Sequence, residues 1–192
     1  MKKLILAEYQ GRRDTEGRAV GHAPKVLGEY AALTADACEL RIMAPECILK
    51  AASAPGRKNA KILPHSILMK SGNSLFEKIW NKVKMFANIN LVLRSGEADE
   101  IWFFNTEFYL MLYLALFGNR GKHLVCTLFM ERFGTGALGR IKQFIFERAQ
   151  KKMDLIISAG KSFSFKNVPY VFIPDYYCSE DEYTPFRKAV RK

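Results

Sequence analysis

Short apolar runs recur along the chain, and each is followed by polar or glycine-rich residues. Runs of four to eight such residues are typical of buried strands, whereas apolar positions three or four apart indicate helices. Strands are expected at residues 3–8, 39–43, 60–63, 100–104, 123–129, 155–158 and 170–173. Helices are expected at residues 24–34, 74–86, 106–117 and 136–153.

This alternation of strands and helices predicts an α/β fold. Parallel strands need right-handed crossovers, which place helices on both faces of the sheet. We therefore predict a three-layer, doubly wound, mainly parallel sheet of the Rossmann-like type, with about six or seven strands, one for each apolar run. The first strand is expected at or near its centre. Residues 1–178 would form one domain, and residues 179–192 would begin a linker.

Two of the predicted helices have an apolar side. In the helix at 74–86 that side comprises Leu75, Phe76, Ile79, Trp80, Val83 and Phe86. In the helix at 136–153 the residues expected to face inward are Leu138, Ile141, Phe144, Ile145 and Ala149. Its basic residues Arg140, Lys142, Arg148, Lys151 and Lys152 are expected to face outward.

The chain is strongly basic, with 30 Lys and Arg against 19 Asp and Glu and a net charge of +11. Such an excess indicates an anionic partner: a nucleic acid, an anionic membrane or a phosphorylated ligand. The helix at 74–86 carries Lys78, Trp80, Lys82 and Lys84, a composition that suits an anionic membrane surface. The alternative is an amphipathic core helix whose lysine face is solvated. The pattern of this helix, taken alone, favours that alternative somewhat.

The four cysteines, Cys38, Cys47, Cys126 and Cys178, show no zinc-ligand spacing. We expect free thiols, with Cys38 and Cys126 as small core residues, and a reducing cytosol. No apolar stretch approaches the roughly 20 residues needed to cross a bilayer, and the first apolar run is too short for a secretory signal. We therefore expect a cytoplasmic protein.

Functional groups of a parallel sheet gather at the carboxyl ends of its strands. The polar loop after the first strand, residues 11–22, carries Gly11, Arg12, Arg13, Gly17, Arg18 and His22. The glycines would let a ligand approach the backbone, and the arginines would bind phosphate. The alternatives are an ordinary surface loop with turn glycines and, for His22, a helix cap.

Four more residues follow strands at the same predicted edge: Asn105, Thr106, Glu131 and Ser158. We expect them to face the ligand cleft. Capping is the alternative for Asn105 and Thr106, and simple solvation is the alternative for Glu131.

Several well-known site motifs are absent from the sequence. There is no GxGxxG after the first strand, no GxxxxGK[ST], no GxSxG and no recognised nucleic-acid module. The three histidines are scattered and suggest no metal cluster. The residues therefore assign no catalytic group, no metal and no cofactor.

The last part of the chain carries a more specific pattern. Residues 153–158 read MDLIIS, residues 168–177 read VPYVFIPDYY, and residues 182–186 read EYTPF. With the order of elements, this pattern resembles the N-terminal domain of GT-B glycosyltransferases of the family-4-like retaining group. Three features depart from that family: Asp175-Tyr176 replaces asparagine-glycine, the first loop lacks paired glycines, and Met130-Glu131 stands where many members carry histidine.

The resemblance implies an acceptor-binding domain whose donor-binding partner domain is absent. The complete enzyme would transfer a sugar from a nucleotide-sugar to a saccharide or lipid-linked acceptor, as in polysaccharide biosynthesis, at the inner face of the membrane. Nucleic acid is the least favoured partner. Two alternatives stay open: a non-catalytic subunit that recruits a donor-binding chain, and a stand-alone basic domain that binds a nucleotide or nucleic acid.

Overall fold

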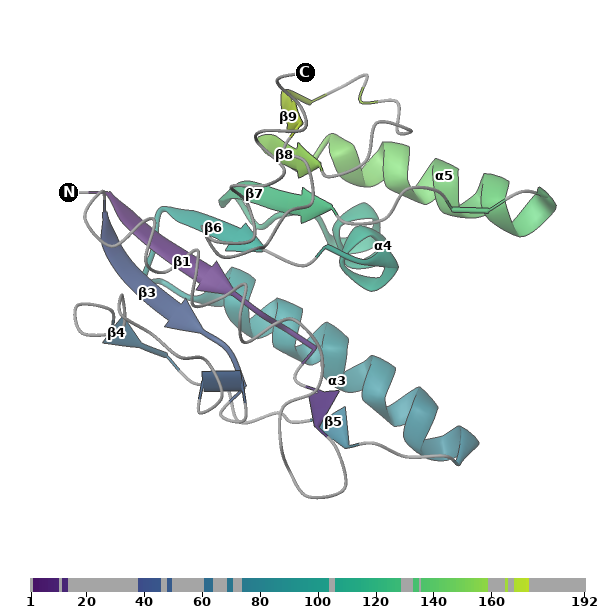
Figure 1. Cartoon of the computed structure of the whole chain (residues 1–192), viewed down its shortest axis with the longest axis horizontal. Helices are drawn as coiled ribbons and strands as arrows, with labels where there is room; N and C mark the ends of the chain where they lie inside the picture. Colours follow the sequence, from purple (N-terminus) through teal and green to yellow (C-terminus); the bar gives the residue numbers. More distant parts are fainter. Residues whose placement is uncertain are drawn as a thin grey trace, which may run out of the picture.

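The computed structural model describes residues 2–10, 12–13, 38–45, 48–49, 61–63, 69–70, 74–103, 106–128, 133–134, 136–158, 165 and 168–172. Their main feature is a seven-stranded sheet with the order β4-β3-β1-β6-β7-β8-β9, in which every neighbouring pair is parallel (Figure 1). The strands are β1 (Lys3–Ala7), β3 (Glu39–Met43), β4 (Lys61–Ile62), β6 (Glu100–Phe103), β7 (His123–Leu128), β8 (Leu155–Ser158) and β9 (Tyr170–Phe172).

The predicted parallel α/β sheet is therefore confirmed, and β1 lies third in it, beside the middle strand β6. One part of the first polar segment differs from the prediction. Strand β2 (Arg12–Arg13) pairs in parallel with β5 (Met69–Lys70) in a separate two-stranded sheet. The loop expected over residues 11–22 thus contains a short strand.

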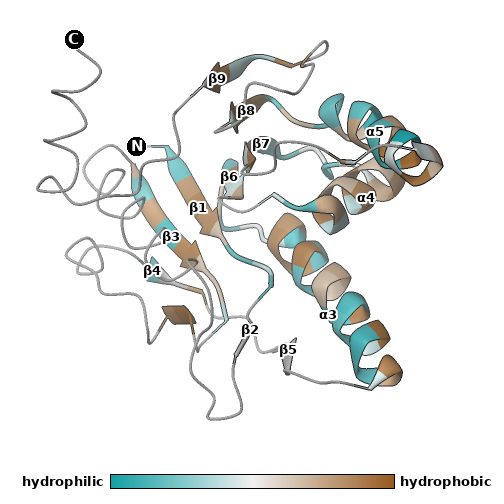
Figure 2. Cartoon of the chain, turned by 45° about the vertical axis from the view of Figure 1, so that its right-hand side comes forward, coloured by the Kyte–Doolittle hydropathy of each residue, from teal (hydrophilic) through white to brown (hydrophobic). Residues whose placement is uncertain are grey.

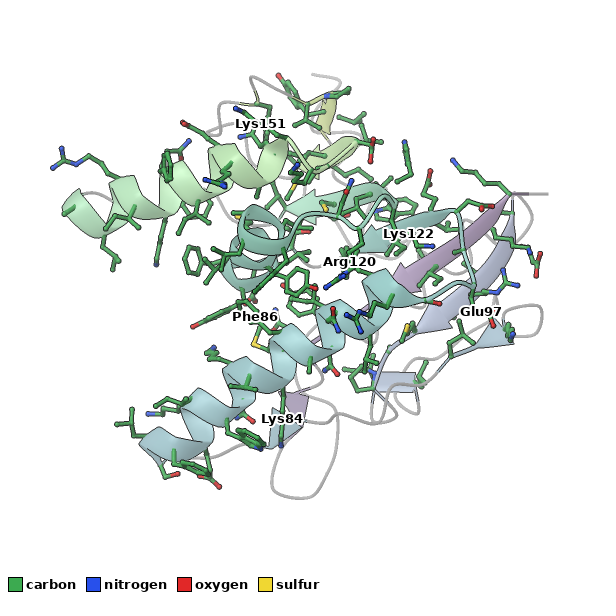
Figure 3. The ribbon with its side chains drawn as sticks, turned by 180° about the vertical axis from the view of Figure 1, so that it is seen from behind. Lys84, Phe86, Glu97, Arg120, Lys122 and Lys151 are labelled. Atoms are coloured by element: carbon green, nitrogen blue, oxygen red, sulfur yellow. The ribbon has the colours of Figure 1, made fainter. Side chains whose placement is uncertain are left out.

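Three helices cover one face of the sheet, as Figures 2 and 3 show from two directions. They are α3 (Leu75–Arg94), α4 (Phe108–Phe117) and α5 (Gly136–Gln150), and α4 packs between the other two. Among the described helices, none has the length and apolar character needed to cross a membrane.

Helix α3 begins with a capping box, in which Ser74 and Glu77 satisfy each other's backbone N–H groups. It is longer than the prediction, which ended at residue 86. The inward face of its second half includes Asn88, whose side-chain amide donates to the carbonyl oxygen of Tyr9 at 2.8 Å. This buried polar residue interrupts the apolar pattern that the prediction followed.

The core lies between the sheet and the three helices. Ile5, Phe103 and Leu124 from the strands pack there with Ile89, Leu114 and Phe146 from the helices, all fully buried. Successive strand residues point to opposite faces, so Leu6 lies on the other face from Ile5, and it is also fully buried. Both faces of β1 are therefore covered, as a layered fold requires. The helix expected over residues 24–34 lies outside the described residues.

The prediction that the apolar side of α5 faces inward is wrong for three of its five residues, whereas Ile145 is half-buried and Ala149 is buried. The apolar side of α3, for which a core position was one of two alternatives, is also mostly exposed. Leu75, Phe76, Ile79, Trp80 and Val83 are exposed on α3, and so are Leu138, Ile141 and Phe144 on α5. Both helices begin beyond the carboxyl ends of the strands of the seven-stranded sheet, so this sheet does not extend beneath their first turns (Figure 1). Phe86 lies further along α3, where it packs against Tyr113 of α4.

The start of α5 depends on a glycine. A Cβ atom on Gly139 would lie 2.3 Å from the carbonyl oxygen of Gly134, so the preceding loop crosses the helix at a point where only glycine fits. Gly134 itself has a φ of 84°, which also favours glycine. These two positions hold the first turn of α5 in its protruding place.

Candidate functional site

The strand order identifies where a ligand is expected to bind. From β1 the chain leads to β3 on one side, whereas β6, β7, β8 and β9 follow one another on the other side. Ligands of open parallel sheets bind outside the carboxyl ends of the strands where this direction reverses. In this sheet that point lies between β1 and β6, which are hydrogen-bonded neighbours.

Three buried residues, Glu8, Tyr9 and Gln10, follow β1 at this point. The backbone N–H of Glu8 donates to the carbonyl oxygen of Met43 at 3.0 Å, which extends the contact with β3. The backbone N–H of Gln10 donates to the Glu8 carboxylate at 2.6 Å, and Asn88 fixes the backbone of Tyr9. The chain leaving β1 is therefore held by polar contacts beneath the reversal point.

The phenol of Tyr9 connects β1 with the start of α4. Its oxygen accepts a hydrogen bond from the backbone N–H of Glu107 at 3.1 Å. Burial raises the pKa of Tyr9 well above its usual value of 10.0, and the negative charges of Glu107 and Glu8 add to this effect. The Tyr9 hydroxyl therefore keeps its proton at neutral pH.

Glu107 presents the accessible carboxylate of this end of the sheet. It is the N-cap residue of α4, and its half-buried side chain makes no capping hydrogen bond. Within the described part of the chain, its carboxylate has no hydrogen-bond or ion-pair partner. It is therefore free to accept hydrogen bonds from a ligand hydroxyl beside the point where the strand order reverses.

Buried hydroxyl groups join the ends of the neighbouring strands. The backbone N–H of Thr106 donates to the carbonyl oxygen of Thr127 at 2.9 Å, and the indole of Trp102 donates to the Thr127 hydroxyl at 3.1 Å. Thr106 and Ser158 are almost completely buried. The structure thus places both at the predicted edge, beneath its surface, and their contact with a ligand stays a prediction.

The other predicted substrate-binding residues lie outside the part of the chain that the structure describes. They are Gly11, Gly17, Arg18, His22, Asn105 and Glu131. Arg12 and Arg13 are described only as the backbone of β2.

The four predicted membrane-binding residues of α3 differ in their surroundings. Lys78 and Trp80 are exposed, and Lys84, labelled in Figure 3, is half-buried. The ammonium group of Lys82 lies 3.9 Å from the centre of the Tyr109 ring, so it makes a cation–π contact with α4. Lys82 therefore connects two helices as well as carrying charge.

The described residues contain no cluster of three or more His, Cys, Asp or Glu side chains able to hold a metal ion. A basic pocket of about 470 Å³ lies at the second half of α5, lined by Phe144, Glu147, Arg148, Lys151 and Lys152. Cys38 and Cys126 are buried free thiols, as predicted.

The sequence-based prediction assigned no ligand-binding role to Glu107 or to the three residues from Glu8 to Gln10. Because carboxyl ends of strands carry ligand sites, the first polar residues after each strand were a usable signal. After the first strand, the prediction instead chose the longer arginine-rich segment that follows Gln10. After the strand that ends before Asn105, it chose Asn105 and Thr106, which directly precede Glu107.

Comparisons with known proteins identified no relative that would assign a role to these residues. No protein-family description matches the sequence, and no curated protein matches it. The resemblance to GT-B glycosyltransferases therefore depends on the order of elements and on residues 153–186.

Proposed function

We propose that this chain is the acceptor-side domain of a GT-B glycosyltransferase of the family-4-like retaining group. The parallel sheet of Rossmann-like type supports this, because each GT-B domain has such a sheet. The resembling residues 155–158 and 170–172 form β8 and β9, which are adjacent and parallel. This is the arrangement that the two matching steps of the family pattern require.

The observation that carries the proposal is Glu107 beside Tyr9 at the reversal point. A carboxylate accepts hydrogen bonds from hydroxyl groups, which saccharides present in number. The protonated Tyr9 hydroxyl and the buried polar residues below it keep this corner of the sheet rigid. The domain would thus hold an acceptor hydroxyl in place while a donor-binding domain supplies the nucleotide-sugar.

Catalysis in the completed enzyme would depend on positioning and on stabilising the departing diphosphate. This domain would contribute the positioning. No metal or cofactor enters the proposal. The reaction would take place at the cytoplasmic face of a membrane, where the basic helix α3 would lie.

The test is acceptor binding by the intact chain. We expect a glycan and glycolipid array to identify a saccharide or lipid-linked saccharide ligand, with only weak binding of free nucleotide-sugars. Glu107→Gln should weaken binding of that ligand about tenfold, because the acceptor loses its charge and hydrogen bonds to charged groups are the stronger ones. Asp99→Asn is the matched control, since Asp99 is an exposed acid at the opposite end of the sheet.

Two results would contradict the proposal. One is saccharide binding that Glu107→Gln leaves unchanged. The other is tight binding of RNA or DNA with a steep salt dependence and no binding of saccharides, which would favour the alternative of a basic nucleic-acid-binding domain.

Two further residues become testable when the chain is joined to a donor-binding domain. Arg18→Ala and Glu131→Ala should each lower sugar transfer with little change in melting temperature. Transfer that stays intact in either variant would remove that residue from the site.

A further inference from the structure

Residues 138–144 of α5 form an apolar surface that faces solvent. Leu138, Ile141 and Phe144 follow one another at intervals of three and are 65, 55 and 64 % exposed. Gly139, Phe146 and Gln150, which α5 buries against the rest of the protein, lie on the other side of the helix. The three exposed residues are called the α5 tip below.

The first half of α3 has a surface of the same kind. Leu75, Phe76, Ile79, Trp80 and Val83 are at least half exposed, and the rings of Phe76 and Trp80 are stacked with 8° between their planes. These five residues are called the α3 tip. Figure 2 shows apolar patches on the first turns of both helices.

Helix α4 contacts both of the helices that carry the tips. Lys82 of α3 lies over the ring of Tyr109, and Lys142 of α5 lies 5.5 Å from the centre of the Phe108 ring. Both tips extend past the carboxyl ends of the strands, on the side where Glu107 begins α4 (Figure 1). The candidate site therefore lies at the same end of the molecule as both tips.

The charges around the tips indicate what covers them. No Asp or Glu occurs between residues 132 and 146, whereas Arg140 and Lys142 do. On α3 the one acidic residue, Glu77, is engaged in the capping box, and Lys78 and Lys84 flank the apolar residues. Apolar residues with basic neighbours on a helix are typical of a surface that lies in the interface of an anionic bilayer.

We propose that the α5 tip and the α3 tip together form one surface that docks on an anionic membrane. The inference deepens the membrane part of the proposed function and depends on it. It adds α5 as a second point of attachment, which fixes the orientation of the domain. It also indicates the substrate class, since a site held between two membrane-bound helices would receive a lipid-linked acceptor.

The first experiment measures sedimentation with vesicles of equimolar phosphatidylcholine and phosphatidylglycerol. A variant with Leu138→Gln and Phe144→Gln should lose at least about tenfold in partitioning, because two apolar side chains that would insert into the bilayer are removed. A variant with Leu75→Gln and Phe76→Gln should lose a similar factor. The changed residues are exposed in the free protein, so melting temperatures should stay the same.

The matched control is Leu116→Gln in the last turn of α4. Leu116 is 63 % exposed, nearly the same as Leu138, but it lies at the other end of the helix layer. Its substitution should leave partitioning within about twofold of the unchanged protein, since surface substitutions away from a contact have small effects.

The second experiment places a fluorescent probe on each position. In a Trp80→Phe background the remaining tryptophan is Trp102, which is half-buried in β6. Phe144→Trp should be strongly quenched by brominated lipid, whereas Leu116→Trp should not be quenched. Equal quenching of the two would overturn the inference, because the whole helix layer would then contact lipid.

The outcomes separate this inference from the proposed function. If only the α3 variant loses vesicle binding, the second attachment is wrong, whereas the membrane part of the proposed function stands. If the unchanged chain binds no vesicles, both fall, but the acceptor test with Glu107→Gln is unaffected. If the chain is a dimer that Leu138→Gln and Phe144→Gln dissociate, the tip is an interface between copies, and the inference is wrong.

Discussion

The two ends of the sheet are built from different kinds of interaction. At the amino end, ionisable side chains of neighbouring elements pair with one another. Glu100 binds Lys2 and His123, and buried Arg41 lies between Glu39 and Glu97. At the carboxyl end, neutral hydrogen bonds join the strands, and the carboxylate of Glu107 is left free within the described residues.

This difference separates stability from ligand binding. Figure 3 shows Glu97 and Lys122 at the amino end, far from Lys84 on the outer half of α3. Lys122 donates to the carbonyl oxygen of Ala98 at 3.0 Å and so joins two connections at that end. Charges that are already paired can contribute to stability, but they are not available to a ligand. We therefore expect substitutions at the two ends to have different consequences.

The largest effect is expected at Cys126, which lies in β7 near the carboxyl end. Burial raises the pKa of its thiol from 9.0 to about 12, so the reactive thiolate is about a thousandfold rarer than in the unfolded chain at the same pH. Alkylation of Cys126 at mildly alkaline pH, followed by peptide mass spectrometry, should be at least that much slower in the folded protein. Similar rates with and without urea would show that a cleft opens down to β7.

The next effect is expected at the amino end. The double change Glu39→Gln and Glu97→Gln leaves the buried Arg41 guanidinium without a carboxylate and should clearly lower the free energy of unfolding. Urea denaturation measures this. Glu107→Gln, the same change at the carboxyl end, should alter stability by no more than about 0.5 kcal/mol. Equal losses of unfolding free energy in the two variants would contradict the proposed difference between the two ends of the sheet.

A smaller effect is expected for the neutral contacts of the carboxyl end. Thr127→Val keeps the shape of the side chain and removes the acceptor for the Trp102 indole, so it should cost about 1 kcal/mol. Thermal unfolding measures the change, and Thr127→Ser, which keeps the hydroxyl, is the control. If Thr127→Ser costs as much as Thr127→Val, packing of the methyl group matters instead of the hydrogen bond.

The smallest effect is a dependence on pH at the amino end. Hydrogen bonding and charge from Lys61, with a further contribution from Arg41, lower the pKa of Glu97 below its usual 4.5. A lowered pKa stabilises the fold above the unfolded value, and this stabilisation disappears as the pH falls through the folded value. The stability difference between the unchanged chain and Glu97→Gln should therefore be largest near neutral pH and shrink in acid. A stability difference that stays constant down to strongly acidic pH would show that the ionisation of Glu97 does not contribute to stability.

Local pattern was sufficient for the strands. The sequence predicted β3 and β8 with their exact bounds, and β1, β6 and β7 to within one residue. Short apolar runs of this length are typical of buried strands, so the local pattern was enough to identify them. Their alternation with helices was also enough to predict parallel pairing, since parallel neighbours need crossovers. The polar cluster of Glu8 to Gln10 lies where the strand-end rule directs attention.

The surfaces of α3 and α5 were decided by the tertiary structure. Periodicity identified Leu138, Ile141 and Phe144 as one face, but it assigned that face to the core. A helical period shows which residues share a side. Whether another element covers that side depends on where the helix begins relative to the sheet, and both helices begin beyond it.

Glu107 illustrates the same limit at the scale of one residue. Its position after Asn105 and Thr106 is visible in the sequence, whereas its neighbour Tyr9 is 98 residues away along the chain. The contact exists because β1 and β6 are adjacent, and that adjacency results from the packing of the whole sheet. By itself the sequence determined the strands of the large sheet and their alternation with helices, since these depend on neighbouring residues. The tertiary structure decided which side chains meet and which apolar faces stay exposed, because both depend on contacts between distant parts of the chain.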